Sequence, residues 1–148
     1  MQNSNIIKSI LFVAVQFVCL GLIALSGPLI PSNPALLVLL LLGLGLGVWA
    51  ILAMRIGNFN IAPDPLARSQ LVTSGPYSKI RHPMYLALLL ATIPLVINSF
   101  DPLRFSIWLI LLIDLLLKLN YEEKLLVVKL AGYDQYRKRS YRLIPFVY

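Results

Sequence analysis

The stretch SILFVAVQFVCLGLIALSGPLIPSNPALLVLLLLGLGLGVWAILAM, residues 9–54, contains no Asp, Glu, Lys, Arg or His. One helix needs roughly 20 apolar residues to cross the hydrocarbon core of a bilayer, and this stretch is about twice as long. Gly27-Pro28 and Pro31-Ser32-Asn33-Pro34 interrupt it, because proline lacks an amide donor and biases the preceding residue away from helix. The stretch therefore predicts two membrane-crossing helices, near 8–28 and 34–55.

The rest of the chain contains two more apolar runs, Pro83 to Phe100 and Leu103 to Leu117. With 59% hydrophobic and 13% charged residues, the composition lies outside the range of soluble domains. We therefore predict a single all-α domain, an integral membrane bundle of about four transmembrane helices. The remaining predicted segments are helices near 83–100 and 103–130, a cytoplasmic loop at 56–82 and a C-terminal tail at 131–148.

Positive charge is distributed unevenly over the predicted loops. All but one of the 13 Lys and Arg residues fall on one side of a four-helix arrangement, and only Arg104 lies beside the opposite loop. By the positive-inside rule the charged side is cytoplasmic, and both termini lie there. Topology and attraction to anionic membrane lipids account for the charge, so no nucleic-acid partner is expected. The absence of organelle signals and the short chain favour a bacterial inner membrane.

Three features of the apolar half have alternative interpretations. A signal peptide could explain the first apolar run, but the run is longer than a typical signal and no convincing cleavage site follows. The series Gly43-x-Gly45-x-Gly47 resembles a dinucleotide-binding fingerprint, yet it follows no strand, so close helix packing is favoured. The only cysteine and the only histidine are Cys19 and His82, and no metal site is indicated.

The segment LVTSGPYSKIRHPMY, residues 71–85, is the most specific in the chain. Pro83 suits the first position of a helix, which makes His82 the expected cap of the third helix. The unpaired amides of this first turn form an anion site that Arg81 would reinforce. His82 and Tyr85 are three residues apart, so they project from about the same face. Alternatively, His82 only caps the helix and Tyr85 only anchors it at the interface.

Acidic residues occur at the end of the fourth apolar run. Glu122 and Glu123 are adjacent on a helix that has just left the lipid, where they could face solvent and pair with Lys118 or Lys124. Asp114 lies inside the run, and an unpaired carboxylate facing lipid costs several kcal/mol. We therefore expect Asp114 to face the bundle interior with Lys118 as its partner; contact with a substrate is the second interpretation.

The order of these motifs resembles that of the isoprenylcysteine carboxyl methyltransferase and phospholipid methyltransferase superfamily, small membrane enzymes that use S-adenosylmethionine. The resemblance covers roughly Ile56 to the C-terminus. It implies methyl transfer to a lipophilic substrate, either an isoprenylcysteine-type carboxylate or a lipid, and a cytoplasmic cofactor pocket closed by the loop and the tail. The motifs are Leu71-Val-Thr-Ser-Gly-Pro-Tyr77, Arg81-His-Pro-Met-Tyr85, Glu122-Glu123, Gly132-Tyr-Asp-Gln-Tyr136 and Leu143-Ile-Pro145.

The resemblance also implies which residues contact the cofactor. These residues are Gln70, Leu71, Val72, Tyr77, His82, Pro83, Met84, Tyr85, Glu122 and Glu123. The isoprenylcysteine enzymes resemble one another in placing an arginine a few residues before the glutamate pair to meet the substrate. Lys118, Leu119 and Asn120 occupy that region here, so Lys118 and Asn120 are the substrate-binding candidates and the substrate itself is in doubt.

The residue types suit methyl transfer from a sulfonium cofactor. Carboxylates can accept hydrogen bonds from ribose or ammonium, the helix start can bind a carboxylate, and tyrosine rings can face the cation. In-line transfer of a methyl group depends chiefly on positioning and exclusion of water, so no covalent catalytic residue is assigned. His82 and Arg81 are the positioning candidates. A carboxylate acceptor needs no base, whereas a lipid amine must first lose a proton.

Two other functions remain possible from the sequence. Sterol reductases have a similar C-terminal architecture and would place NADPH in such a pocket, although this chain is short for one. A non-catalytic membrane protein could instead use the basic tail to bind anionic lipid or a protein partner.

Overall fold

The computed structural model describes residues 2–54 and 70–147, and side chains from Ile6 onward. The described part is helical, with one isolated β-bridge between Ile80 and Tyr141 in place of any strand. The elements are α1 (Gln2–Leu25), α2 (Pro34–Met54), the 3-10 helix η1 (Gly75–Ser78), α3 (Pro83–Asn98), α4 (Pro102–Lys129) and α5 (Tyr133–Arg137). The predicted all-α class is confirmed; α1 begins earlier than predicted, and residues 56–69 of the predicted loop lie outside the described residues.

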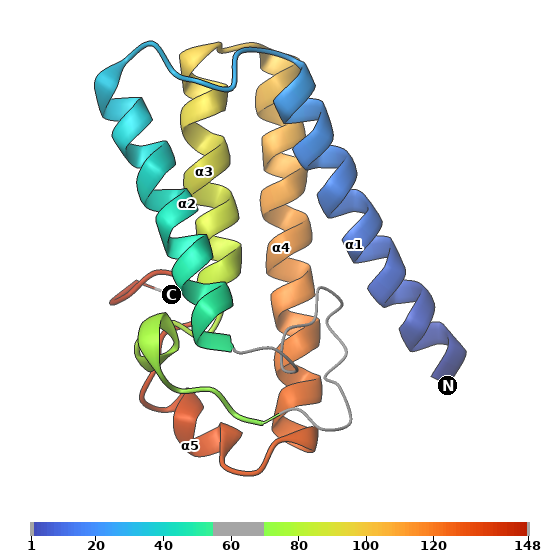
Figure 1. Ribbon diagram of the computed structural model, residues 1–148. Coiled ribbons are helices and arrows are strands. Elements are labelled where there is room, and N and C mark those ends of the chain that lie inside the picture. Colours follow the sequence, from blue (N-terminus) through green and yellow to red (C-terminus); the bar gives the residue numbers. More distant parts are fainter. Residues whose placement is uncertain (1, 55–69, 148) are drawn as a thin grey trace.

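The four long helices lie side by side in the order α2, α3, α4, α1, and successive helices along the chain run in opposite directions (Figure 1). Helices α1 and α2 are therefore neighbours in sequence but lie at opposite edges of the bundle. Two of the helices, over Ile6–Leu25 and Pro34–Met54, are long and apolar enough to cross a membrane. Their outward faces expose large apolar side chains such as Leu42 and Leu52, which lipid would cover.

Small residues bring α2 and α3 together. A Cβ atom added at Gly43 would lie 2.6 Å from the backbone N of Ala91, and one at Gly47 would lie 3.5 Å from Cβ of Ala87. A Cβ at Gly45 would meet nothing within 4 Å. The predicted role of this glycine series in helix packing is confirmed for two of its three members, and the third faces away from α3.

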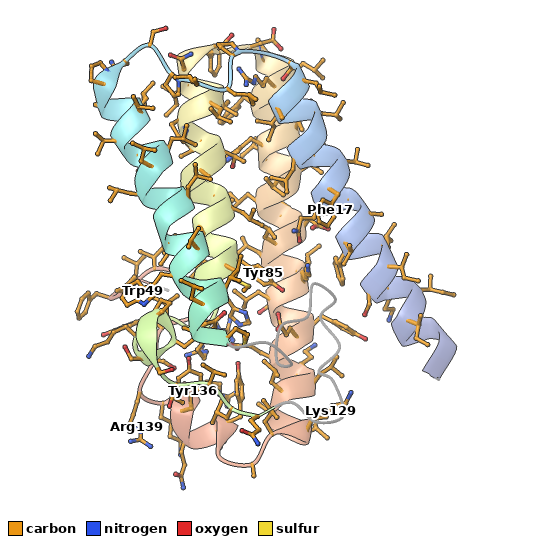
Figure 2. All side chains as sticks on the ribbon, viewed as in Figure 1. Phe17, Trp49, Tyr85, Lys129, Tyr136 and Arg139 are labelled. Carbon is orange, nitrogen blue, oxygen red and sulfur yellow. The ribbon has the colours of Figure 1, made fainter. Side chains whose placement is uncertain are left out.

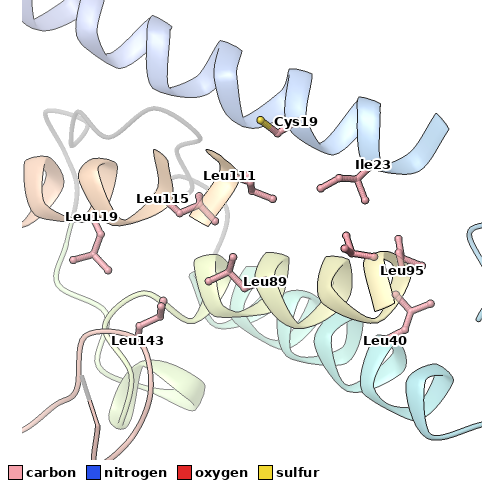
Figure 3. Close-up of a cluster of buried hydrophobic side chains, with 10 residues drawn as sticks. Cys19, Ile23, Leu40, Leu89, Leu95, Leu111, Leu115, Leu119 and Leu143 are labelled. Carbon is pink, nitrogen blue, oxygen red and sulfur yellow. The ribbon is translucent and has the colours of Figure 1, made fainter. Parts of the chain in front are cut away.

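A leucine-rich cluster forms the core where α1, α3 and α4 meet. Figure 3 shows Cys19 and Ile23 of α1 beside Leu111 and Leu115 of α4, with Leu89 of α3 nearby. These side chains are almost completely buried. Burial of a leucine or isoleucine contributes about 1.5–3 kcal/mol where the reference is water, and less where lipid replaces water.

The cation that stands alone on the less charged side has a structural role. Arg104 donates from Nη2 to the carbonyl of Ile23 at 2.8 Å and from Nη1 to that of Ser99 at 3.3 Å. It thereby satisfies a carbonyl in the last turn of α1, which otherwise lacks an intrahelical partner. Gly27 permits this contact, because a Cβ there would lie 2.5 Å from Nη1 of Arg104.

Polar groups also meet inside the bundle. Lys118 is 1% exposed and donates from Nζ to Oε1 of Gln16 on α1 at 2.7 Å. Asp114 is buried, as predicted for a residue that faces the interior. Lys118 interacts with Asp114 through charge, as predicted, while its hydrogen bond goes to Gln16 across the helix interface.

Candidate functional site

Backbone hydrogen bonds tie the C-terminal tail to the segment that precedes α3. Tyr141 N donates to the carbonyl of Lys79 at 2.8 Å, Arg81 N donates to that of Tyr141 at 2.8 Å, and His82 N donates to that of Arg142 at 3.1 Å. Tyr136 on α5 adds a bond from its hydroxyl to the carbonyl of Tyr77 at 2.6 Å. These contacts hold the segment before α3 and the C-terminal tail together at one end of the bundle.

Glu123 lies between two guanidinium groups. Arg81 Nε donates to Oε1 of Glu123 at 2.6 Å, and the two side chains are only 6% and 5% exposed. Arg142 Nε lies 3.2 Å from the other oxygen, Oε2. Burial by itself raises the pKa of Glu123, but its interactions with His82 and Arg81 outweigh burial and lower the pKa to about 2. Glu123 is therefore a carboxylate throughout the physiological range.

The imidazole of His82 lies between the two glutamates. Its Nδ1 is 3.6 Å from Oε2 of Glu122, and its Nε2 is 3.5 Å from Oε1 of Glu123. His82 occupies the N-cap position of α3 with Pro83 next, as predicted, but its side chain makes no capping hydrogen bond. The interpretation of His82 as a simple cap is therefore wrong, because the ring is directed at the carboxylates.

Tyr85 links this charged cluster to the bundle interior. Its hydroxyl donates to Oε2 of Glu122 at 2.6 Å, and its ring stacks on that of His82 with centroids 5.3 Å apart. The ammonium of Lys118 lies 5.3 Å from the centroid of the same ring. The predicted shared face of His82 and Tyr85 is confirmed. Because Tyr85 bonds a glutamate, it does more than anchor the helix at the membrane interface.

An apolar groove of about 370 Å³ opens between α1 and α2, and α3 forms its floor. Phe17 of α1, Val48 of α2 and Met84 of α3 are among its lining residues. Lys118 and Tyr85 line it as well, and Figure 2 shows Tyr85 and Phe17 on the helices that border it. Tyr85 therefore contacts the groove and a carboxylate at the same time, so an apolar tail in the groove would end beside the charged cluster.

The structure brings together four of the predicted cofactor residues, His82, Tyr85, Glu122 and Glu123. Of the others, Pro83 is buried at the start of α3 and Gln70 is exposed. Leu71 packs near the start of α5, with Cδ2 3.9 Å from a Cβ built at Gly132, and Val72 is partly buried. Burial raises the pKa of the Tyr77 phenol, and the negative charge of Glu122 adds to that rise. Of the two substrate candidates, Lys118 lines the groove, and Asn120 accepts a hydrogen bond from Arg142 at 3.3 Å.

Several residues of this cluster were not predicted from the sequence. Arg142, Ser140 and Tyr136 reach the site from the tail, and Ser140 accepts a hydrogen bond from Nη1 of Arg81 through its carbonyl. Sequence spacing gives no signal for such contacts, which join residues 19 to 59 positions apart. Gln16 had a signal, because a side-chain amide inside an apolar run usually has a partner in the bundle.

The donor and acceptor set fits a small molecule that carries hydroxyl, ammonium and carboxylate groups. Glu122 and Glu123 supply acceptors, and the cationic side chains around them supply donors. Nε2 of His82 and the hydroxyl of Tyr77 are buried and make no hydrogen bond to any residue that the structure describes, so both atoms can bond a ligand.

Comparison with known proteins adds a family assignment. The family model for phospholipid methyltransferases matches residues 34–131, a range that includes α2, α3, α4, the histidine motif and the glutamate pair. No curated protein and no solved structure matches the chain. Since the match covers about two-thirds of the sequence, the protein belongs to the phospholipid methyltransferase family, a family of membrane methyltransferases.

Proposed function

We propose that this protein transfers a methyl group from S-adenosylmethionine to a lipophilic acceptor at the cytoplasmic surface of a bacterial inner membrane. The observation that supports this most directly is the position of Tyr85, whose hydroxyl bonds Glu122 while its ring lines the apolar groove. The polar cluster and the apolar groove therefore share Tyr85 as a common residue.

In this proposal all four long helices cross the membrane, and both termini are cytoplasmic. The single Lys or Arg at one end of the bundle, against the many at the end that holds the glutamates, supports this orientation. Helix α3 has only 16 residues, so it spans about 24 Å, and the neighbouring α2 and α4 would cover the remaining thickness.

The cofactor would lie against His82, Tyr85 and the glutamate pair. Glu122 and Glu123 would accept hydrogen bonds from ribose hydroxyls or the ammonium, and the ring of Tyr85 would face positive charge. When bound, the cofactor supplies an electrophilic methyl group. Arg81 keeps Glu123 ionised and fixed, so the acceptor groups need little reorganisation when the cofactor binds.

Tyr85 and the groove would position the methyl acceptor. An apolar tail in the groove would bring the polar head of the acceptor to Lys118 and Tyr85, next to the charged cluster. The surrounding apolar side chains exclude water from this meeting point, and in-line transfer benefits from such positioning and exclusion. No residue of the chain needs to form a covalent bond to the methyl group.

Cofactor binding tests the polar half of the site. We expect His82→Ala to weaken binding of S-adenosylmethionine at least tenfold, about 1.4 kcal/mol, when measured by isothermal titration calorimetry in detergent. Lys79→Ala is the matched control, because Lys79 is exposed three residues earlier and should bind as the wild type does. Equal affinity in the wild type and in His82→Ala would remove the imidazole from the site. Saturable binding of NADPH instead would indicate a reductase, and binding of neither ligand would indicate a non-catalytic protein.

A bulky side chain in the groove tests the apolar half. Val48 lines the groove and is 58% exposed, so Val48→Trp should fill part of it without disturbing the core. We expect a several-fold higher KM for the lipid acceptor in a methyl-label transfer assay on membrane lipid, with unchanged affinity for S-adenosylmethionine. Leu52→Trp is the control, since Leu52 lies one turn further along α2, is 72% exposed and lies outside the groove lining. Equal KM values for both variants would exclude the groove as the acceptor site.

A further inference from the structure

A second hollow is lined in part by Glu123 and shares no lining residue with the groove. It measures about 380 Å³ and lies between the last turns of α4 and the C-terminal tail. Its lining residues are Asn120, Glu123, Lys124, Val127, Arg137 and Arg142. In contrast to the apolar groove, three of these six side chains are cations.

The charges around this hollow leave a net positive potential. Glu123 already pairs with Arg81 at 2.6 Å on its buried side, so the guanidinium of Arg81 neutralises its negative charge. Arg137 pairs with Asp134 at 3.1 Å, but both side chains are largely exposed, and such a pair contributes little. The hollow and its surroundings therefore contain four cations, which are Arg81 and the three lining side chains. They contain two carboxylates, Glu123 and Asp134. A hollow of this charge favours an anionic group.

One donor of the hollow, Arg142, is held in place by its neighbours. Arg142 is held from two directions, by its ion pair with Oε2 of Glu123 at 3.2 Å and by its bond to Oδ1 of Asn120 at 3.3 Å. Lys124 is exposed and makes no ion pair with any residue that the structure describes. A bound anion could thus meet one guanidinium that is already positioned and one ammonium that can move to reach it.

The depth of the hollow in the membrane identifies the kind of anion. Helix α4 has 28 residues and is about 42 Å long, whereas the hydrocarbon core is about 30 Å thick. Its last turns, from Asn120 to Lys129, therefore extend into the headgroup layer if the helix crosses the membrane as proposed. A hollow at that depth would lie at the level of the lipid phosphate groups.

We propose that this hollow binds the phosphate group of an anionic phospholipid of the cytoplasmic leaflet. The inference rests on the membrane crossing of α4 given under the proposed function, and it is separate from the methyl acceptor and the cofactor. Because Arg142 contacts both the hollow and Glu123, a bound headgroup also holds the tail against the helix that carries the glutamate pair.

Lipid titration followed by native mass spectrometry tests this site. Detergent-solubilised protein is titrated with phosphatidylglycerol and, separately, with phosphatidylcholine. We expect the wild type to bind phosphatidylglycerol at least tenfold more tightly, and the double variant Lys124→Gln/Arg137→Gln to lose this preference. The matched control is Lys138→Gln/Arg139→Gln, which removes the same charge from neighbouring exposed residues outside the lining and should keep the preference. Thermal unfolding midpoints close to that of the wild type show that both double variants are folded.

Other outcomes of the same experiment would overturn the site. An equal loss in both double variants would show only diffuse attraction to basic residues. Displacement of the lipid by millimolar inorganic phosphate would assign the hollow to a free anion, and displacement by S-adenosylhomocysteine would assign it to the cofactor. If the wild type prefers phosphatidylglycerol but does not bind S-adenosylhomocysteine, the lipid site stands and the proposed methyltransferase function fails. If it binds S-adenosylhomocysteine without preferring phosphatidylglycerol, the reverse holds.

Discussion

Glu123→Gln is expected to destabilise the protein by about 3–5 kcal/mol, because it removes one partner of a buried ion pair. Arg81 would then remain buried with its charge uncompensated, since its other contacts are the carbonyls of Arg137 and Ser140 and the Ser140 hydroxyl. Thermal and denaturant-induced unfolding in detergent, followed by the fluorescence of Trp49 and Trp108, measures this loss. Affinity for S-adenosylmethionine should fall at least tenfold in the same variant.

The effect of Glu123→Gln should depend on pH in a defined direction. The folded-state pKa of Glu123 is about 2, below the ordinary value of 4.5, so its ionisation stabilises the folded state. This contribution is fully present above about pH 4.5 and is lost as the pH falls toward 2. The stability difference between the wild type and Glu123→Gln should therefore shrink over that window.

Glu122→Gln provides the matched control for this change. Glu122 is 24% exposed, and a glutamine there retains an oxygen that can accept from the hydroxyl of Tyr85. We expect a loss of stability several times smaller than at Glu123. Equal losses at the two positions would show that the buried pair with Arg81 has no special role in stability.

Gly43→Ala is the second change with a large expected effect. The new methyl group would lie 2.6 Å from the backbone N of Ala91 and 2.8 Å from the backbone C of Leu90. Backbone atoms cannot move aside as a flexible side chain can, so α2 and α3 must separate or shift along each other. We expect a destabilisation of about 1–3 kcal/mol or more, measured as a lower unfolding midpoint in detergent.

The control for this change lies two residues along the same helix. Gly45 meets nothing within 4 Å, so Gly45→Ala introduces the same methyl group without a clash and also raises the helix propensity. We expect an unfolding midpoint equal to that of the wild type or slightly higher. A similar loss in both variants would mean that glycine at these positions matters for reasons other than the close approach of α2 and α3.

The parts predicted well from the sequence depend on local rules. Proline at the first helical position set the starts of α2 and α3, and the three-residue spacing of His82 and Tyr85 placed both on one face. The contacts of the buried charges were not predictable in this way. Arg81 pairs with Glu123 on α4, and Lys118 forms a hydrogen bond with Gln16 on α1. Both contacts depend on the tertiary arrangement of the helices, which no local pattern encodes.

The groove between α1 and α2 is held at one end and is free to widen at the other. At one end, the guanidinium of Arg104 holds the last turn of α1, and the connection to α2 is held by a bond from Ser32 N to Oδ1 of Asn98 at 2.9 Å. Toward its other end α1 leans away from the bundle (Figure 1). With the helices crossing the membrane as proposed, α1 can move away from the bundle only at the end that holds the glutamates. An acyl chain would therefore enter the groove there, from the cytoplasmic leaflet, with its headgroup beside the glutamates.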